Sequence, residues 1–77
     1  MRGLTSVDLG REIRKARKAQ GLRQEDLAGL SGVGTRFVIE VERGKETAQM
    51  GRVLRLLAVL GCDMSLGFPG ETNGERR

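Results

Sequence analysis

Residues 21–45 read GLRQEDLAGLSGVGTRFVIEVERGK, and this stretch decides the fold. It predicts two short helices, over residues 24–31 and 35–43, separated by a turn at Gly32 and Val33. Glycine in the turn permits the left-handed backbone that a sharp change of direction needs. Each helix has an apolar side, made by Leu27, Ala28 and Leu30 in the first and by Phe37, Val38 and Val41 in the second.

Two amphipathic helices of this length bury both apolar sides only when they cross each other and rest on further elements. A helix-turn-helix arrangement meets this requirement and leaves one polar face of its second helix pointing outward. The charge distribution agrees with such a surface. The chain of 77 residues carries a net charge of +4, and residues 1–45 alone hold ten Lys/Arg against six Asp/Glu. A positive field at this end would attract a polyanion, although a merely solvated surface also explains the charge.

The small size of the chain predicts one domain that needs a staple or a partner chain. The single cysteine, Cys62, cannot form an internal disulfide, and the absence of histidine argues against a zinc site. Oligomerisation in a reducing, cytoplasmic compartment is the staple that remains. No signal peptide is evident, and no apolar run approaches the ~20 residues of a membrane span.

A helix is also predicted before the motif, over residues 6–20. Thr5 to Asp8 resemble a capping box at its start, and Gly21 ends it. Its buried stripe consists of Leu9, Ile13 and Ala16.

Arg17 lies beside that stripe by helical angle, and a partly buried arginine needs a partner. Glu42, near the end of the third helix, is the candidate for a structural salt bridge. A solvated Arg17 is the alternative.

A fourth helix is predicted over residues 48–60, with Thr47 as its cap. Apolar residues at helical spacing form its core side: Met50, Val53, Leu54, Leu57 and Leu60. Leu56 and Val59 project to another side, where a monomer would expose them, so we expect a subunit contact there.

Residues 62–68 alternate with period two and predict one strand, which Pro69 ends. A lone strand leaves its backbone unsatisfied, so we expect it to pair with the same strand of a second chain across a two-fold axis. A short fifth helix or an extended tail is the alternative. The expected dimer interface consists of Leu56, Val59, Met64, Leu66 and Phe68.

The chain thus divides into a loose lead-in (1–5), a helix-turn-helix domain (6–61), a dimerisation strand (62–68) and a disordered tail (69–77). The expected fold is all-α, with four helices and one C-terminal strand that pairs across a homodimer. No enzyme is expected, because histidine, a phosphate-binding glycine loop and a catalytic triad are missing. No cofactor or metal is expected either, and Cys62 is interpreted as a small core residue.

Three segments resemble the Cro/C1-type (Xre) helix-turn-helix family: GLxQExLA at residues 21–28, GV at 32–33 and VxxVERGK at 38–45. The resemblance covers roughly residues 9–60. Residues 57–66 further resemble the HipB-type antitoxins, in which a C-terminal strand pairs across the dimer.

This resemblance implies a lambda-repressor-like homodimer that binds a palindromic operator, represses its own operon and binds a HipA-type kinase toxin. It also implies an Arg17–Glu42 pair, because the family tends to place an arginine and a glutamate at these positions. A stand-alone phage-type repressor without a toxin, and a protein-interaction module that does not bind DNA, are the alternatives.

The start of a recognition helix reaches base edges in the major groove. The expected base-reading residues are therefore Thr35, Arg36 and Phe37, with Glu40 one turn further on. Arg36 suits a bidentate contact with guanine. Glu40 would accept from cytosine N4 or orient Arg36 through an i,i+4 pair. Phosphate contacts are expected from Arg23, Gln24, Gly34, Arg43 and Lys45.

Two of these residues depart from the family pattern. Arg23 stands where a threonine or serine commonly caps the helix, which costs about 1 kcal/mol but places a cation near the DNA backbone. Phe37 stands where a small polar residue is common, and it would contact thymine methyl groups or pack inward.

Overall fold

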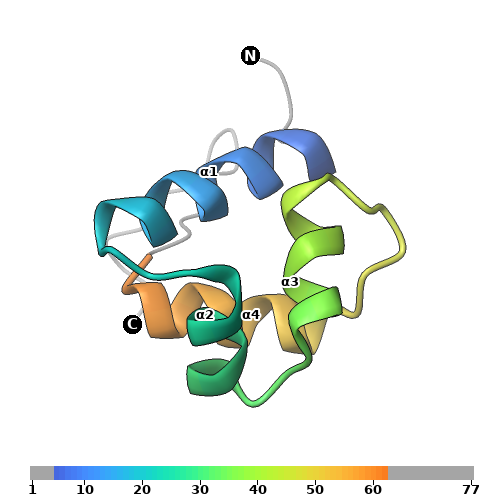
Figure 1. Cartoon of the computed structure of the whole chain (residues 1–77). Coiled ribbons are helices and arrows are strands. Elements are labelled where there is room, and N and C mark those ends of the chain that lie inside the picture. The colour runs from blue at the N-terminus through green and yellow to red at the C-terminus, as the bar shows by residue number, and fades with distance from the viewer. Residues whose placement is uncertain (1–4, 63–77) are drawn as a thin grey trace, which may run out of the picture.

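The computed structural model describes residues 5–62, and all regular secondary structure within that range is helical. Helix α1 spans Ser6–Ala19, α2 spans Gln24–Ser31, α3 spans Thr35–Glu42 and α4 spans Met50–Leu60. Figure 1 shows α1 passing over the other three helices, with α3 on one side and α4 behind α2. The four predicted helices are therefore present in the predicted order. The predicted strand beyond Cys62, and with it Met64, Leu66 and Phe68, lies outside the described residues.

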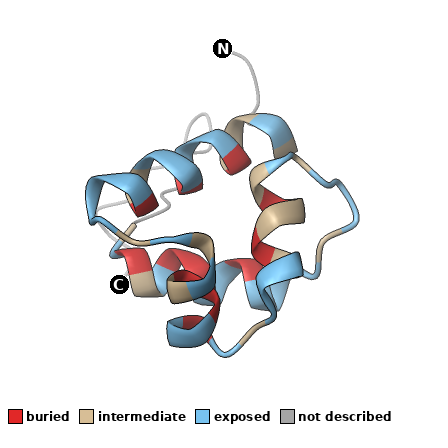
Figure 2. Cartoon of the chain, viewed as in Figure 1, coloured by how far each residue is buried: buried red, intermediate tan, exposed pale blue. Residues whose placement is uncertain are grey.

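One core joins all four helices. The four largest fully buried side chains come one from each helix: Ile13, Leu27, Val38 and Leu56. In Figure 2 the buried positions of the helices face the middle of the molecule and the exposed positions face outward. Burying four branched side chains completely stabilises the fold by roughly 1.5–3 kcal/mol each, so every helix contributes to a single cooperative unit.

The predicted core side of α4 was right at Val53, Leu57 and Leu60, which are buried, and wrong at three other positions. Leu56 was expected on an exposed subunit contact, but it is fully buried in the core of its own chain. Leu54 was expected in the core, but half of its surface is exposed, and Met50 is exposed as well. Val59 is half-buried and packs against the chain's own core. Eight of the eleven residues of α4 are apolar, so more than one stripe fits helical spacing, and the buried stripe contains Leu56 in place of Leu54.

The helix starts differ in whether a side chain caps them. At α1, the Thr5 hydroxyl accepts from the Asp8 N–H at 3.0 Å and the Asp8 carboxylate accepts from the Thr5 N–H at 3.2 Å, which completes the predicted capping box. At α4, the predicted cap Thr47 was wrong, because the helix begins later and its cap residue, Gln49, makes no side-chain cap hydrogen bond. At the turn between α2 and α3, Gly32 adopts φ +70°, as the turn prediction requires.

Two acidic residues at helix starts have lowered pKa values. The hydrogen bonds from Thr5, first from its backbone and then from its side chain, lower the pKa of Asp8 below 3.8. The backbone N–H of Arg23 likewise lowers the pKa of Asp26 below 3.8. Both groups bind protons less readily when the chain is folded. Their contribution to stability is therefore present above pH 3.8 and is lost as the pH falls through the lower, folded-state pKa values.

A buried ion pair connects α1 with the end of α3. Arg17 Nε donates to Glu42 Oε2 at 2.6 Å, and Arg17 Nη2 donates to Glu42 Oε1 at 3.0 Å. Arg17 Nη1 donates to the Leu22 carbonyl at 2.8 Å, so the guanidinium also holds the connection between α1 and α2. Only 8% of the Arg17 side chain and 3% of the Glu42 side chain are exposed. The pair that the sequence suggested is thus present as a bidentate, nearly dry contact.

Helices α1 and α3 also touch at the backbone, at Gly10. A Cβ atom added to Gly10 would meet the carbonyl oxygen of Val41 and would lie 2.9 Å from that of Glu42. Backbone atoms cannot move aside as a flexible side chain can. Only glycine therefore fits the point where the two helices cross.

We expect Gly10→Ala to destabilise the fold by about 1–3 kcal/mol, because the added methyl overpacks a backbone contact. Gly29→Ala is the matched control, since Gly29 also lies inside a helix but an added Cβ would meet nothing within 4 Å. That control should raise stability by roughly 0.5–1 kcal/mol through helix propensity. Chemical denaturation measures both changes, and equal effects of the two substitutions would contradict the close contact.

We expect Glu42→Gln to destabilise the fold by about 3–5 kcal/mol, because it leaves the Arg17 charge buried without a counter-charge. Glu25→Gln serves as control, since Glu25 pairs with Arg23 at 3.2 Å on an exposed surface and should change stability by less than about 1 kcal/mol. Thermal unfolding followed by circular dichroism checks both. A Glu42→Gln protein as stable as the control would refute a stabilising role for the pair.

Candidate nucleic-acid interface

Helix α3 forms a ridge on the surface. Val38 and Val41 anchor its inner side in the core. Outward-facing positions follow at i, i+3, i+4 and i+7, where Arg36 and Arg43 are exposed and Ile39 and Glu40 are half-buried. The two expected contact residues at its start, Gly34 and Thr35, are also exposed. The leading edge of the helix is therefore free to meet a ligand.

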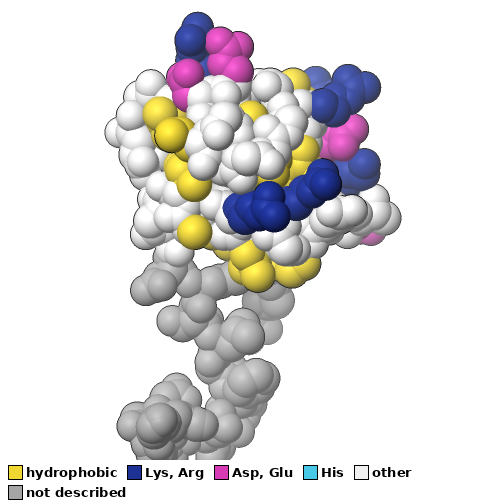
Figure 3. Space-filling model, turned by 90° about the horizontal axis from the view of Figure 1, so that it is seen from below, with side chains coloured by type: hydrophobic (Ala, Val, Ile, Leu, Met, Phe, Trp, Pro, Cys, Tyr) yellow, Lys and Arg dark blue, Asp and Glu magenta, His cyan; other side chains and the backbone are white. Residues whose placement is uncertain are grey.

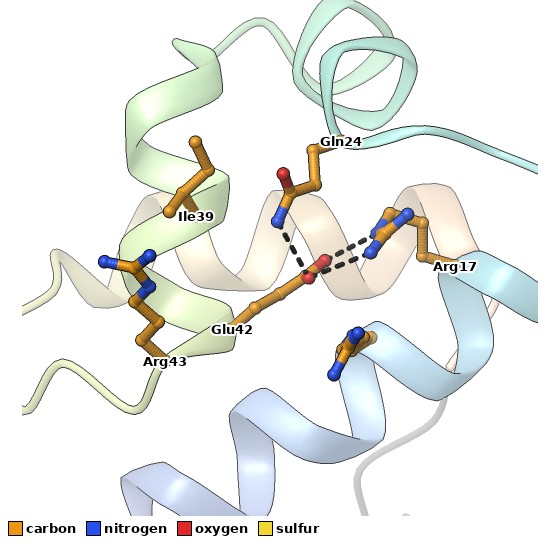
Figure 4. A pocket seen from close by; sticks show the side chains of 6 residues that line it. Arg17, Gln24, Ile39, Glu42 and Arg43 are labelled. Atoms are coloured by element: carbon orange, nitrogen blue, oxygen red, sulfur yellow. Dashed lines mark hydrogen bonds and ion pairs between the residues drawn. The ribbon is translucent and has the colours of Figure 1, made fainter.

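A hollow of about 430 Å³ lies on the side of the ridge that faces α1 and α2. Figure 4 shows Arg17 and Gln24 pointing toward Glu42 across this hollow, with Ile39 and Arg43 on α3 at its edge. The hollow contains three arginines and one glutamate, and Glu42 already neutralises one of the arginines. An excess of positive charge therefore remains. The lining residues are Arg14, Arg17, Gln24, Ile39, Glu42 and Arg43.

Gln24 is held in place by the buried ion pair. Its Nε2 donates to Glu42 Oε1 at 3.1 Å. A side-chain amide has two N–H donors, so one remains for an anion in the hollow. Gln24 is also the first residue of α2, whose free N–H groups and dipole favour negative charge.

A second hollow, of about 220 Å³, lies on the opposite side of the ridge, between α3 and the start of α4. Phe37 forms part of its wall and packs against the core, and Arg52 Cζ lies 6.0 Å from the centre of its ring. Lys45 and Arg52 supply positive charge there. The lining residues are Phe37, Glu40, Lys45, Thr47, Ala48, Gln49 and Arg52.

Arg23 does not line either hollow. Its side chain is 74% exposed and lies 3.2 Å from Glu25 and 3.4 Å from Asp26, two acidic residues of its own helix. Arginine carries only donors, so the cap of α2 comes instead from Asp26, whose carboxylate accepts from the Arg23 N–H at 2.8 Å. The expected loss of a side-chain cap at residue 23 agrees with the structure.

Several residues that line the hollows were not selected from the sequence, and three of them bear on binding: Arg14, Arg52 and Ile39. Arg14 and Arg52 belong to α1 and α4 and reach the two hollows only through the tertiary fold, so spacing within the motif gives no sign of them. Ile39 could have been found, because an isoleucine on the outward stripe of α3 interrupts its polar face. A half-buried apolar side chain there offers a surface for a methyl group.

Positive side chains are concentrated on one side of the molecule, whereas apolar atoms are spread over the face seen from below. Figure 3, which views the chain from below, shows Lys and Arg side chains toward the side on which α3 lies in Figure 1. An acidic side chain lies among them, and apolar atoms appear between them.

Among residues 5–62, no group of acidic, cysteine or histidine side chains could hold a metal ion. No helix in this part of the chain has the length and hydropathy of a membrane span.

Comparison with known proteins identifies the motif. A helix-turn-helix family model matches residues 13–66. The chain is 51% identical over 67 residues to the uncharacterized HTH-type transcriptional regulator y4mF of Sinorhizobium fredii, a match that covers 87% of this chain and 88% of that protein. A second HTH-type transcriptional regulator, from Haemophilus influenzae, is 35% identical over 60 residues, or 78% of this chain and 61% of that protein.

A solved structure agrees with these sequence matches. The restriction-modification controller protein C.AhdI from Aeromonas hydrophila superposes with a TM-score of 0.68 and 38% sequence identity, over 75% of this chain and 84% of that chain. It supports a four-helix, lambda-repressor-like fold. The chain belongs to the helix-turn-helix family of DNA-binding transcriptional regulators, which are not enzymes.

Proposed function

We propose that the protein regulates transcription by placing α3 in the major groove of a specific duplex. The observation that carries this proposal is the ridge of α3 between two hollows that both contain cations. A major groove is bordered by two phosphate backbones, about 12 Å apart. A ridge with positive charge on either side matches that arrangement, since the ridge enters the groove and each hollow faces one backbone.

Base reading is assigned to the outward face of α3. Arg36 is 82% exposed at the side chain and has a fork of donors suited to guanine O6 and N7. Thr35 lies at the helix start, and Ile39 offers an apolar surface to a thymine methyl. Phe37 is not assigned to base reading, because its side chain packs against the core beneath Arg52.

Phosphate contacts are divided between the hollows. Arg14, Gln24 and Arg43 serve the backbone on the α1 side, and Lys45 and Arg52 serve the backbone on the α4 side. Arg23 lies on the exposed surface outside both hollows, and its positive charge attracts DNA as the protein approaches it. Each phosphate neutralised steepens the dependence of log affinity on log salt by about 0.9, so several such contacts make binding strongly salt-dependent.

A homodimer would present two such ridges to a palindromic operator. Because Leu56 is buried in the core of its own chain, it cannot form the expected subunit contact, and the exposed apolar residues of α4 lie on a different face of the helix. Met50 and Leu54, 58% and 50% exposed, share a line at i, i+4 with the exposed Ala58. An apolar line left open on a small domain favours a second copy as its cover. The strand at residues 62–68 remains the other proposed part of the interface.

We propose repression of the chain's own operon on the basis of the family resemblance, since a dimer bound at a promoter would exclude polymerase. We propose a HipA-type kinase toxin as partner on the basis of the resemblance at residues 57–66. The likeness to C.AhdI favours a second candidate, control of a restriction-modification operon. The neighbouring genes distinguish them, since a kinase gene supports the first and a nuclease or methyltransferase gene supports the second.

We expect Arg36→Ala to lower affinity for the operator by about 1–3 kcal/mol and to relax the preference at one base pair. Lys45→Ala should weaken binding to all sequences alike and reduce the salt slope by about one. Fluorescence anisotropy on operator and random duplexes, at several salt concentrations, measures both. Equal losses on both duplexes for the two variants would contradict this division of roles.

We expect Leu54→Glu to weaken dimerisation by at least about tenfold, because it places a charge within an apolar contact. Leu30→Glu is the control, since Leu30, which was wrongly expected on the buried side of its helix, is 63% exposed on α2, outside the α4 line. Sedimentation equilibrium measures both. A dimer unchanged by Leu54→Glu would remove α4 from the interface.

A further inference from the structure

The carboxylate of Glu40 holds two of the cations that the proposed function assigns to DNA. Its Oε1 accepts a hydrogen bond from Lys45 Nζ at 3.0 Å. Its Oε2 lies 3.6 Å from Arg36 Nε. Only 36% of the Glu40 side chain is exposed, so the carboxylate sits partly within the second hollow. One acidic group thus stands between a base-reading cation and a phosphate-binding cation.

The backbone sets up this trio. Arg36 and Glu40 are four residues apart on α3 and therefore share a face. Beyond the helix, the Lys45 N–H donates to the Glu40 carbonyl at 3.1 Å, and Gly44 takes φ +90° in the turn that allows it. The start of the Lys45 side chain is therefore held close to Glu40, and little further ordering is needed to form the pair.

The contact with Arg36 leaves its reading end open. Guanine is recognised by two parallel donors of the guanidinium. Because Glu40 approaches the Nε side, the terminal nitrogens Nη1 and Nη2 stay available. The carboxylate can support the guanidinium from behind while the fork points away from the protein.

We propose that Glu40 is a positioning residue that sets specificity through Arg36 and Lys45 and contacts no base. The inference rests on the DNA-binding function proposed above. On random DNA, the Glu40 charge repels phosphates and competes with them for Arg36 and Lys45, so affinity is lowered. On the operator, the same charge aligns Arg36 with guanine, so affinity is raised. Both effects widen the ratio between operator and random DNA.

The experiment compares the full chain as wild type, Glu40→Gln and the control Glu12→Gln. Glu12 lies on α1, 3.8 Å from Lys15, and its side chain is 61% exposed, so the control makes the same charge change at another surface ion pair. The probes are a duplex that the wild type selects from a random pool and a scrambled duplex of the same length. Anisotropy gives the affinity for each at several salt concentrations.

Glu40→Gln should bind the scrambled duplex roughly threefold more tightly and the selected duplex roughly threefold more weakly, and it should steepen the salt slope on scrambled DNA by about one to two, because two cations become free for phosphates. The ratio of affinities for selected and scrambled DNA should fall by about tenfold. Glu12→Gln should leave that ratio unchanged. In an Arg36→Ala background, Glu40→Gln should no longer weaken binding to the selected duplex, because the residue that it positions is absent.

Glu40→Asp separates charge from position, since it keeps the carboxylate but withdraws it by one methylene. It should bind scrambled DNA as the wild type does and bind the selected duplex more weakly. An unchanged ratio in Glu40→Gln would overturn the inference while leaving DNA binding intact. A loss confined to one C·G pair would overturn it too, since direct contact with cytosine N4 would give that result. Wild type with no salt-dependent affinity for any duplex would overturn the DNA-binding function as well.

Discussion

The buried pair between Arg17 and Glu42 is the constraint on which the rest of the structure depends. A guanidinium and a carboxylate leave water only when each finds a full set of partners. Here those partners come from α1, from the connector at Leu22, from the start of α2 at Gln24 and from the end of α3. Any relative movement of these segments would leave a charge or an amide unpaired in a nearly dry site. The pair therefore fixes the end of α3 against the scaffold that carries it.

This constraint explains how so small a chain can hold a reading helix rigidly. Helix α3 has eight residues, which is too short to be stable alone. Val38 and Val41 pack the inner face of α3 into the core, and Glu42 pairs with Arg17 at its end. The outer face stays exposed and is available to a ligand. The cations that flank it come from α1, from α4 and from the turn that follows α3. Precision thus resides in the scaffold, and sequence recognition resides in the few outward side chains of one helix.

Much of this arrangement could be predicted from local sequence. The bounds of α2, the turn at Gly32, the capping box at Thr5 and the pairing of Arg17 with Glu42 all depend on nearby residues or on one angular argument, and the structure contains each of them. The register of α4 could not be predicted, because its apolar residues cover more than one face and only the packing of the other helices selects Leu56 over Leu54. Arg14 and Arg52 were missed for the same reason, since their place beside α3 is a tertiary property.

The contact at Gly10 has a consequence for how such a protein can change over time. Since α1 and α3 meet peptide against peptide, their separation is set by main-chain dimensions, which substitution elsewhere on α3 leaves alone. Substitutions at the outward positions of α3 can then change which duplex is preferred, while the orientation of α3 relative to α1 stays the same. A lineage built on this crossing is free to diversify its targets one side chain at a time, provided that the glycine itself is kept.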